Sequence, residues 1–143
     1  MFAIFGIRKT LELAVGMFAI ALLDNQEEKL YLLRDRFGEK PLYYGLVGES
    51  YNKSLVFASE IHSISKLPFF EKEINALSFE YFLRLSYIPK YLSIYKNIFK
   101  VKPASMLIFD LKENLNKSPK EINWWSHLNT IKKNLSNKFL NEE

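Results

Sequence analysis

The chain has 143 residues, of which 48% are hydrophobic, and this is enough to form one domain with a core. It contains no cysteine, which excludes disulfides, cysteine metal sites and any cysteine nucleophile supplied by this sequence. The formal net charge of +4 comes from 20 basic and 16 acidic residues spread along the chain, and so modest an excess favours a solvated surface over a nucleic-acid interface.

The N-terminal region is apolar. Residues 1–7 predict a strand, and Arg8 and Lys9 then precede an apolar run over 13–23 that superficially resembles a signal peptide. The run is shorter than the roughly 20 apolar residues that a bilayer requires. We therefore expect a buried strand in a cytoplasmic protein with no membrane segment.

The next segments predict an antiparallel meander. Residues 16–23 are continuously apolar, which is typical of a strand covered on both faces. Strands are also predicted over 30–35, 42–46 and 55–58, with polar turns between them.

A charged turn links the second and third of these strands. Arg34 and Asp35 stand where one strand ends, so their charges can close on each other or on backbone groups of the turn. Gly38 permits a positive φ, and Pro41 fixes φ before the next strand. We interpret the turn as a structural clasp.

Two helices follow. Ser59 is a candidate N-cap for a helix that Pro68 ends, and the single His62 on it is expected to be exposed and not to bind a metal. Asn75 is expected to cap the second helix, with Glu80 and Arg84 paired on its surface. Its apolar positions form one stripe that predicts a core-facing side: Ile74, Leu77, Tyr81, Phe82 and Leu85.

The last part of the chain contains a strand over 105–111 and a charged loop over 112–121. Residues 126–143 could form an amphipathic helix with an apolar stripe of Leu128, Ile131, Leu135 and Phe139.

Four motifs occur in an order that resembles the glutaminase domain of glutamine-dependent asparagine synthetases, and a related version occurs in phosphoribosyl-pyrophosphate amidotransferases. They are Gly-Met-Phe-Ala-Ile-Ala-Leu-Leu-Asp at 16–24, Arg-Asp-x-x-Gly-x-Lys-Pro-Leu-Tyr-Tyr at 34–44, Phe-Ala-Ser-Glu-Ile at 57–61, and the segment 93–103. The resemblance extends to about Trp125. Asn97 and Ala104 stand where the family favours glycine, so the turn at Ala104 is expected to be rearranged.

The resemblance implies an α+β fold of the N-terminal-nucleophile hydrolase type, a four-layer sandwich of helix, sheet, sheet and helix with antiparallel sheets. In the family, most of the front half of the domain separates the N-terminal segment from the motif at 16–24. Here only residues 8–15 lie between residues 1–7 and that motif, so the domain is expected to be internally truncated. We expect a truncated glutamine amidotransferase domain over 1–125 and an amphipathic tail over 126–143. A Ser-Gly-Gly-x-Asp phosphate loop does not occur, so the ATP-using synthetase domain is expected to be absent.

The resemblance also addresses the chemistry. Phe2 occupies the position of the nucleophilic cysteine, and the Asn-Gly-Glu and Ser-Asp motifs that bind glutamine are missing. We therefore predict no catalytic residue, no substrate-binding residue, no metal and no cofactor. The remaining motif residues are predicted to be scaffold: Arg34, Asp35, Gly38, Lys40, Pro41 and Glu60.

Three functions remain open. The chain could be a truncated glutamine-hydrolysing asparagine synthase family member that is inactive alone. It could instead be a binding module or split subunit that docks on a separately encoded synthetase or glutaminase half. A working enzyme that uses Ser50, Ser54 or Tyr43 is the third possibility. Unpaired strand edges would favour association, including a homodimer.

Overall fold

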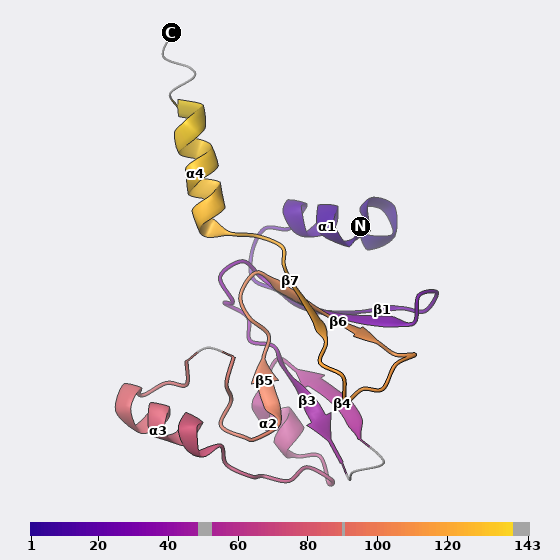
Figure 1. Cartoon of the computed structure of the whole chain (residues 1–143), viewed down its shortest axis with the longest axis vertical. Helices are drawn as coiled ribbons and strands as arrows, with labels where there is room; N and C mark the ends of the chain where they lie inside the picture. The colour runs from indigo at the N-terminus through magenta and orange to yellow at the C-terminus, as the bar shows by residue number, and fades with distance from the viewer. Residues whose placement is uncertain (49–52, 90, 139–143) are drawn as a thin grey trace.

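The computed structural model describes residues 1–48, 53–89 and 91–138. Within them the chain forms, in order, α1 (Phe2–Leu13), β1 (Ala19–Asp24), β2 (Lys29–Arg34), β3 (Tyr43–Val47), β4 (Ser54–Ala58), α2 (Ile61–Ser65), α3 (Ala76–Leu85), β5 (Ile98–Lys100), β6 (Ser105–Asp110), β7 (Lys120–Asn123) and α4 (His127–Lys138). Figure 1 shows their arrangement.

The strands form two antiparallel sheets. The first sheet has the order β1-β2-β6-β7, and the second has the order β4-β3-β5. The prediction of a mixed fold with antiparallel sheets is confirmed, and the strands predicted from 16 to 58 are all present, with bounds shifted by one to three residues.

The two sheets pack face to face. Alternate residues of a strand point to opposite faces, and one face of the first sheet contributes Leu32, Leu107 and Phe109 to a buried cluster. Tyr44 and Leu55 of the second sheet pack against this cluster, and the rings of Tyr44 and Phe109 meet edge to face at 5.9 Å. The main core therefore lies between the sheets.

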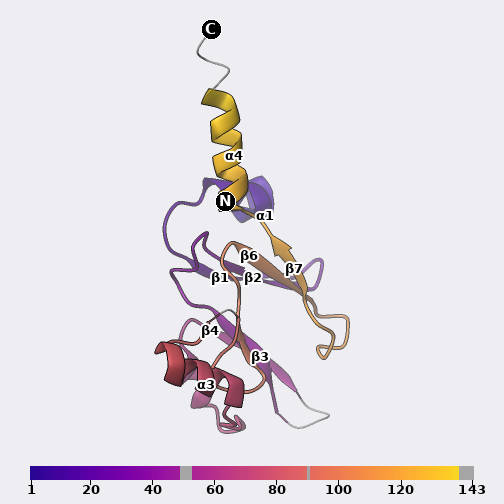
Figure 2. The same cartoon turned by 60° about the vertical axis from the view of Figure 1, so that its left-hand side comes forward.

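The opposite face of the second sheet is covered by α2. Ile64 of α2 packs in a second buried cluster with Val47, Phe70 and Ile98. Figures 1 and 2 show α1 on the far side of the first sheet, and α3 at the end of the molecule next to the second sheet. Helix α4 projects away from both sheets in the two views.

The predicted strand over residues 1–7 is wrong, because this segment begins α1. The N–H of Phe5 donates to the carbonyl of Met1 at 2.9 Å, and the helix bends at Gly6, whose φ is 72°. A short apolar run does not distinguish a strand from a helix by its pattern. Good helix formers follow at 8–13, where Arg8 and Glu12 pair at 3.7 Å, and they continue the helix.

The prediction that the 16–23 strand is buried on both faces is also wrong. The strand begins at Ala19, Ala21 is exposed and Leu23 is 53% exposed. Strand β1 is the edge of its sheet, so its side chains lack neighbours on one side. A continuous apolar run shows that a strand could be buried on both faces. Whether it is buried depends on the elements that lie beside it.

Helix α2 differs from the prediction at both ends. Its N-cap is Glu60 rather than Ser59 and shows no side-chain cap bond. The helix ends at Ser65 with Lys66 as C-cap, before Pro68.

The predicted cap and the predicted surface ion pair of α3 are confirmed, whereas its predicted core-facing stripe is wrong. The N–H of Ser78 donates to Asn75 Oδ1 at 3.1 Å, and Arg84 pairs with Glu80 at 3.1 Å. The apolar stripe does not enter the core, however, since Leu77 and Phe82 are each 49% exposed. The segment before the helix is tied to the body by the N–H of Asn75, which donates to Ile94 O at 2.9 Å. This tether does not bring the helix face onto a sheet.

The last third of the chain contains two left-handed turns, a strand over most of the range predicted for it, and the tail helix. Asn97 and Ala104 have φ of 60° and 51°, so an alanine holds a left-handed conformation at the second turn. The loop predicted over 112–121 ends earlier, because β7 begins at Lys120 and pairs with β6. The predicted tail helix forms as α4, and Phe139 lies outside the described residues.

Candidate functional site

The turn between β2 and β3 is built around the buried guanidinium of Arg34. This group donates to three carbonyl oxygens, those of Lys40 at 2.9 Å, Val101 at 2.6 Å and Gly38 at 2.5 Å. Burial lowers the pKa of Arg34 from its ordinary value, whereas the nearby charge of Asp35 raises it. The side chain therefore joins its own turn to the segment that follows β5.

Asp35, also buried, faces a different set of groups. Its carboxylate accepts hydrogen bonds from the backbone N–H groups of Lys40 at 2.9 Å, Glu39 at 3.0 Å, Phe37 at 3.1 Å and Phe18 at 3.4 Å. Burial by itself would raise the pKa of Asp35, but these hydrogen bonds outweigh it and the pKa lies below its ordinary value. Both charges are thus closed on backbone groups, which is one of the two arrangements that the sequence left open.

Backbone groups of the same residues hold neighbouring segments. The carbonyl of Asp35 accepts from the N–H of Ala104 at 2.8 Å, and the carbonyl of Arg34 accepts from Trp124 Nε1 at 3.3 Å. The turn therefore binds the start of β1, the start of β6 and the chain after β7 in one place.

Gly38, Lys40 and Pro41 complete the turn. Gly38 has a φ of 68°, and a Cβ at this position would lie 2.8 Å from Pro103 Cγ, so both the backbone and the space require glycine. The side chain of Lys40 is exposed, and only its backbone groups bond to Arg34 and Asp35. Glu60 is exposed at the start of α2, and in the described part of the chain no hydrogen bond or ion pair joins it to the turn.

Sequence reasoning missed Arg36. Its guanidinium donates to the carbonyls of Ala14 at 2.5 Å and Glu12 at 3.0 Å, which are free acceptors at the C-terminal end of α1. It also lies over the rings of Trp124 and Trp125, 5.4 and 6.0 Å from their centroids. The signal available in the sequence was a third charge beside Arg34 and Asp35, and its target is visible only once α1 is known to be a helix.

Phe2 occupies the position at which the family resemblance places the nucleophilic cysteine. This residue begins α1 and is half-buried, and its side chain contains no nucleophilic atom. His62 is exposed as predicted. Within residues 1–48, 53–89 and 91–138, no group of three or more His, Asp or Glu side chains is arranged to hold a metal ion.

A pocket of about 660 Å³ opens between the two sheets. Its walls include Tyr44, Phe99 and Phe109, with Lys100, Lys102 and Glu121 also among the lining residues. Lys102 pairs with Glu121 at 2.9 Å, and Lys100 Nζ donates to the carbonyl of Ile88 at 2.7 Å. Burial, with a smaller effect of the Arg34 charge, lowers the pKa of Lys100, and burial raises the pKa of Tyr44.

Of the three residues considered for a different enzyme, the two that the structure describes do not line this pocket. Tyr43 points to the opposite face of the second sheet and packs in the α2 cluster. Ser54 is exposed at the start of β4 and is not a lining residue. Ser50 lies outside the described residues.

Comparison with known proteins identifies the family. The model of the glutamine amidotransferase domain matches residues 1–125. The chain belongs to this family. The amidotransferase-type chain is 37% identical to a putative asparagine synthetase [glutamine-hydrolyzing] 2 of Methanocaldococcus jannaschii over 98 residues, which is 67% of this chain and 18% of the relative. It is 35% identical to asparagine synthetase [glutamine-hydrolyzing] 3 of Bacillus subtilis over 103 residues, or 71% of this chain and 16% of the relative.

A shorter match is to asparagine synthetase [glutamine-hydrolyzing] 2 of Bacillus subtilis, at 43% identity over 61 residues, 43% of this chain and 8% of the relative. The amidotransferase-type chain thus spans less than a fifth of the length of these relatives. The predicted resemblance to glutamine-dependent asparagine synthetases is confirmed. None of the helices described in the structure is both long and apolar enough to span a membrane.

Proposed function

We propose that this chain is a non-catalytic glutamine amidotransferase-type domain that acts by docking on a partner polypeptide. The observation that carries the proposal is residue 2. Phe2 stands at the position that the family resemblance assigns to the nucleophilic cysteine, and the sequence contains no cysteine elsewhere. Covalent attack on the glutamine amide by a cysteine needs a sulfur that this sequence does not supply.

The central turn supports a scaffold role for the motif residues. The charges of Arg34 and Asp35 are directed at backbone groups of their own domain, at 2.5–2.9 Å for Arg34. Both side chains are buried, and the hydrogen bonds that they form in the described residues join them to backbone groups of the domain, which supports a structural role over a clamp that binds a substrate.

The exposed apolar surface supports docking. Leu83 of α3 is 67% exposed, and Phe79, Phe82 and Leu85 of the same helix are each about half exposed. Large exposed apolar side chains that lie together on one surface mark interaction sites in soluble proteins. We infer that the two packed sheets, with α1 on one side and α2 and α3 on the other, are an internally truncated version of the four-layer sandwich, and that a partner covers the surface left open.

The relatives indicate which partner to test. They are named as glutamine-hydrolysing asparagine synthetases, so the proposed partner is a separately encoded synthetase or glutaminase half, acting in asparagine biosynthesis in the cytoplasm. The alternative is a truncated family member without a partner, which the same Phe2 would explain. The two readings differ only in whether the exposed surface binds.

Catalysis is tested with purified chain and glutamine. We expect ammonia release no greater than that of a heat-killed control, and we expect Phe2→Cys not to restore it. Ammonia release by the wild type that survives rigorous purification would overturn the non-catalytic assignment. Turnover by Phe2→Cys alone would show that the substrate-binding residues are present.

Docking is tested by co-expression with the product of any neighbouring reading frame that encodes Ser-Gly-Gly-x-Asp or Asn-Gly-Glu. We expect co-purification that Leu83→Glu abolishes and that Lys112→Glu, a surface change on another part of the molecule, leaves intact. Absence of co-purification with such a product would favour the reading without a partner.

A further inference from the structure

In the part of the chain that the structure describes, the two sheets end in four edge strands, and three of these carry a feature that discourages pairing with another chain. Strand β7 has charged residues Lys120 and Glu121. The β5 edge is covered, because the N–H of Lys100 donates to Tyr91 O at 2.7 Å. Strand β4 is flanked by Lys53 and Glu60. Charges and covering segments are the usual protection of an edge strand.

Strand β1 is different. No charged residue occurs from Leu13 to Leu23, and the strand is also the longest of the four edges, with six residues. In the described residues β1 pairs with β2 alone. Of its six residues only the last, Asp24, is charged, and a largely uncharged edge of this length is a template for a further strand.

The register with β2 shows which backbone groups remain open. The N–H of Asp35 donates to the carbonyl of Phe18 at 3.1 Å, and the register then runs from Ala19 opposite Arg34 to Asp24 opposite Lys29. In an antiparallel ladder alternate residues bond to the same neighbour. Phe18, Ile20 and Leu22 therefore bond toward β2, whereas the backbone groups of Ala19, Ala21 and Leu23 point to the open edge.

We propose that β1 pairs antiparallel with β1 of a second copy of this chain, about a two-fold axis at Ala21. In this register Ala21 faces Ala21 of the second copy, and Ala19 faces Leu23 of the second copy. Each is a hydrogen-bonded pair, because these are the residues whose backbone groups face outward. The two first sheets join into one continuous sheet, and the contact is closed because a two-fold interface uses the same strand on both subunits.

The side chains favour a copy of the same strand as the occupant. The small Ala19 lies opposite the large Leu23, and the two alanines meet at the axis, so the strand complements itself without steric conflict. Leu23, 53% exposed in the single chain, gains an apolar neighbour on the same face of the sheet. No like charges meet along the paired residues.

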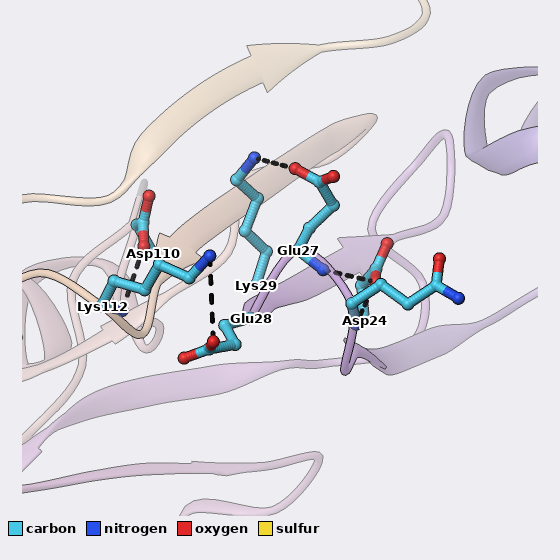
Figure 3. A network of polar contacts seen from close by, with 7 residues as sticks. Asp24, Glu27, Glu28, Lys29, Asp110 and Lys112 are labelled. Carbon is cyan, nitrogen blue, oxygen red and sulfur yellow. Dashed lines mark hydrogen bonds and ion pairs between the residues drawn. The ribbon is translucent and has the colours of Figure 1, made fainter.

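The charged residues that follow β1 form their contacts within the β1–β2 turn or with the neighbouring strands β2 and β6. Figure 3 shows the turn after β1, where Asp24 Oδ1 accepts from the N–H groups of Gln26 and Glu27, each at 3.0 Å. Lys29 pairs with Glu27 at 3.0 Å, and Lys112 after β6 pairs with Glu28 at 3.8 Å. These contacts lead toward β2 and β6 and leave the outer edge of β1 apolar. The inference goes beyond the proposed function, because the pairing holds whether or not the chain hydrolyses glutamine.

The first experiment measures mass in solution by light scattering on a size-exclusion column. We expect twice the 16.9 kDa of a single chain for the wild type, and a single-chain mass for Ala21→Lys, which places two ammonium groups opposite each other at the axis. The matched control is Leu83→Lys, which adds the same charge on α3 and should remain dimeric. A wild-type monomer at high concentration, or loss of the dimer in the control alone, would overturn the proposal; so would open-ended oligomers, which a closed two-fold contact does not form.

The second experiment tests the register and keeps the proposal testable where Ala21→Lys fails to fold. The natural sequence has no cysteine, so one introduced cysteine reports one position. Cα atoms of a hydrogen-bonded antiparallel pair lie about 5.5 Å apart, within the range that a disulfide spans. We expect Ala21→Cys to form a covalent dimer under mild oxidation.

Leu23→Cys is the control for that experiment. In the proposed register the two introduced cysteines would be separated by four residues along the strand, roughly 13 Å, and should not cross-link. Equal cross-linking of both variants, or preferential cross-linking of Leu23→Cys, contradicts the register and with it the proposal.

Discussion

At the residue scale, the buried charges of the central turn hold backbone segments rather than each other. The carboxylate of Asp35 satisfies four N–H groups, and the guanidinium of Arg34 satisfies three carbonyls. Each charged side chain thus supplies the hydrogen bonds that these backbone groups would otherwise form with water. Loss of either side chain leaves buried backbone groups without partners.

Asp35→Ala is expected to lower the free energy of unfolding by at least about 1–3 kcal/mol, the cost of a buried group left unsatisfied. Asp35→Asn retains one acceptor oxygen and should be less damaging. Urea unfolding measures both, with Glu39→Ala as the control, because Glu39 is an exposed carboxylate in the same turn. If the Glu39 variant were destabilised as much as Asp35→Ala, the hydrogen bonds of Asp35 would not be the cause.

Asp35 also predicts a dependence of stability on pH. Its folded-state pKa lies below the unfolded value of about 3.9. The ionised form therefore stabilises the folded state above the unfolded pKa, and this contribution is lost as the pH falls through the folded pKa. The difference in unfolding free energy between wild type and Asp35→Asn should be full at pH 7 and smaller at pH 3. A difference that is constant over this range would contradict the assignment.

Gly38 tests the backbone of the same turn. A left-handed φ costs a non-glycine residue roughly 1–2 kcal/mol, and the Cβ would also press on Pro103. We expect Gly38→Ala to lower the unfolding free energy by at least that amount, and Gly38→Val to lower it further because a β-branched residue tolerates this region least. Equal denaturation midpoints for wild type and Gly38→Val would show that the turn relaxes freely.

At the scale of the elements, Arg36 ties the end of α1 to the central turn, and the helix also buries its own Leu11 and Thr10. Arg36 neutralises the C-terminal end of α1 through the carbonyls of Ala14 and Glu12, and it lies against Trp124 and Trp125. Within the described residues no strand shares an extensive contact with this helix. The hydrogen bonds that hold the C-terminal end of the helix to the turn therefore depend on one side chain, which a single substitution removes.

Arg36→Gln is expected to speed hydrogen exchange across 2–14 severalfold while exchange in β2 and β6 stays near the wild-type rate. Arg36→Lys should behave almost as Arg36→Gln, because an ammonium lacks the planar fork that reaches several carbonyls. Hydrogen-exchange mass spectrometry measures both. The control is Arg84→Gln, which removes an arginine from the exposed pair with Glu80; faster exchange of α1 in that variant would show a general loss of stability instead.

At the scale of the whole molecule, stability is coupled to association. Apolar side chains remain exposed on β1, α3 and α4, including Leu23, Leu83 and Leu128, so these side chains stay in contact with water in the single chain. A partner that binds only the folded chain stabilises it by mass action. The second copy proposed at β1 makes this coupling measurable.

The thermal midpoint of the wild type should rise by several degrees between protein concentrations a hundredfold apart, because dimers bind only folded chains. Ala21→Lys should have a midpoint that does not change with concentration, while Leu83→Lys should follow the wild type. Differential scanning fluorimetry at matched concentrations provides the measurement. A wild-type midpoint independent of concentration would argue against any stabilising self-association.

The sequence alone determined the family, the antiparallel meander and the cap of α3. These features depend on local patterns, such as the order of the motifs, the alternation of apolar runs with turns, and an Asn side chain that reaches an N–H three residues ahead. It also identified Arg34, Asp35 and Gly38 as one structural unit, because they are adjacent in the chain. Local physical chemistry is sufficient for such predictions.

Only the tertiary structure decided which apolar residues are buried. The 16–23 run and the α3 stripe have the composition of core segments, yet β1 is an edge and α3 has an exposed apolar face. The head forms a helix, and Arg36 finds its acceptors at the end of it. Burial and long-range hydrogen bonds depend on which elements lie next to a residue in space. The local sequence does not show whether such a neighbour is present.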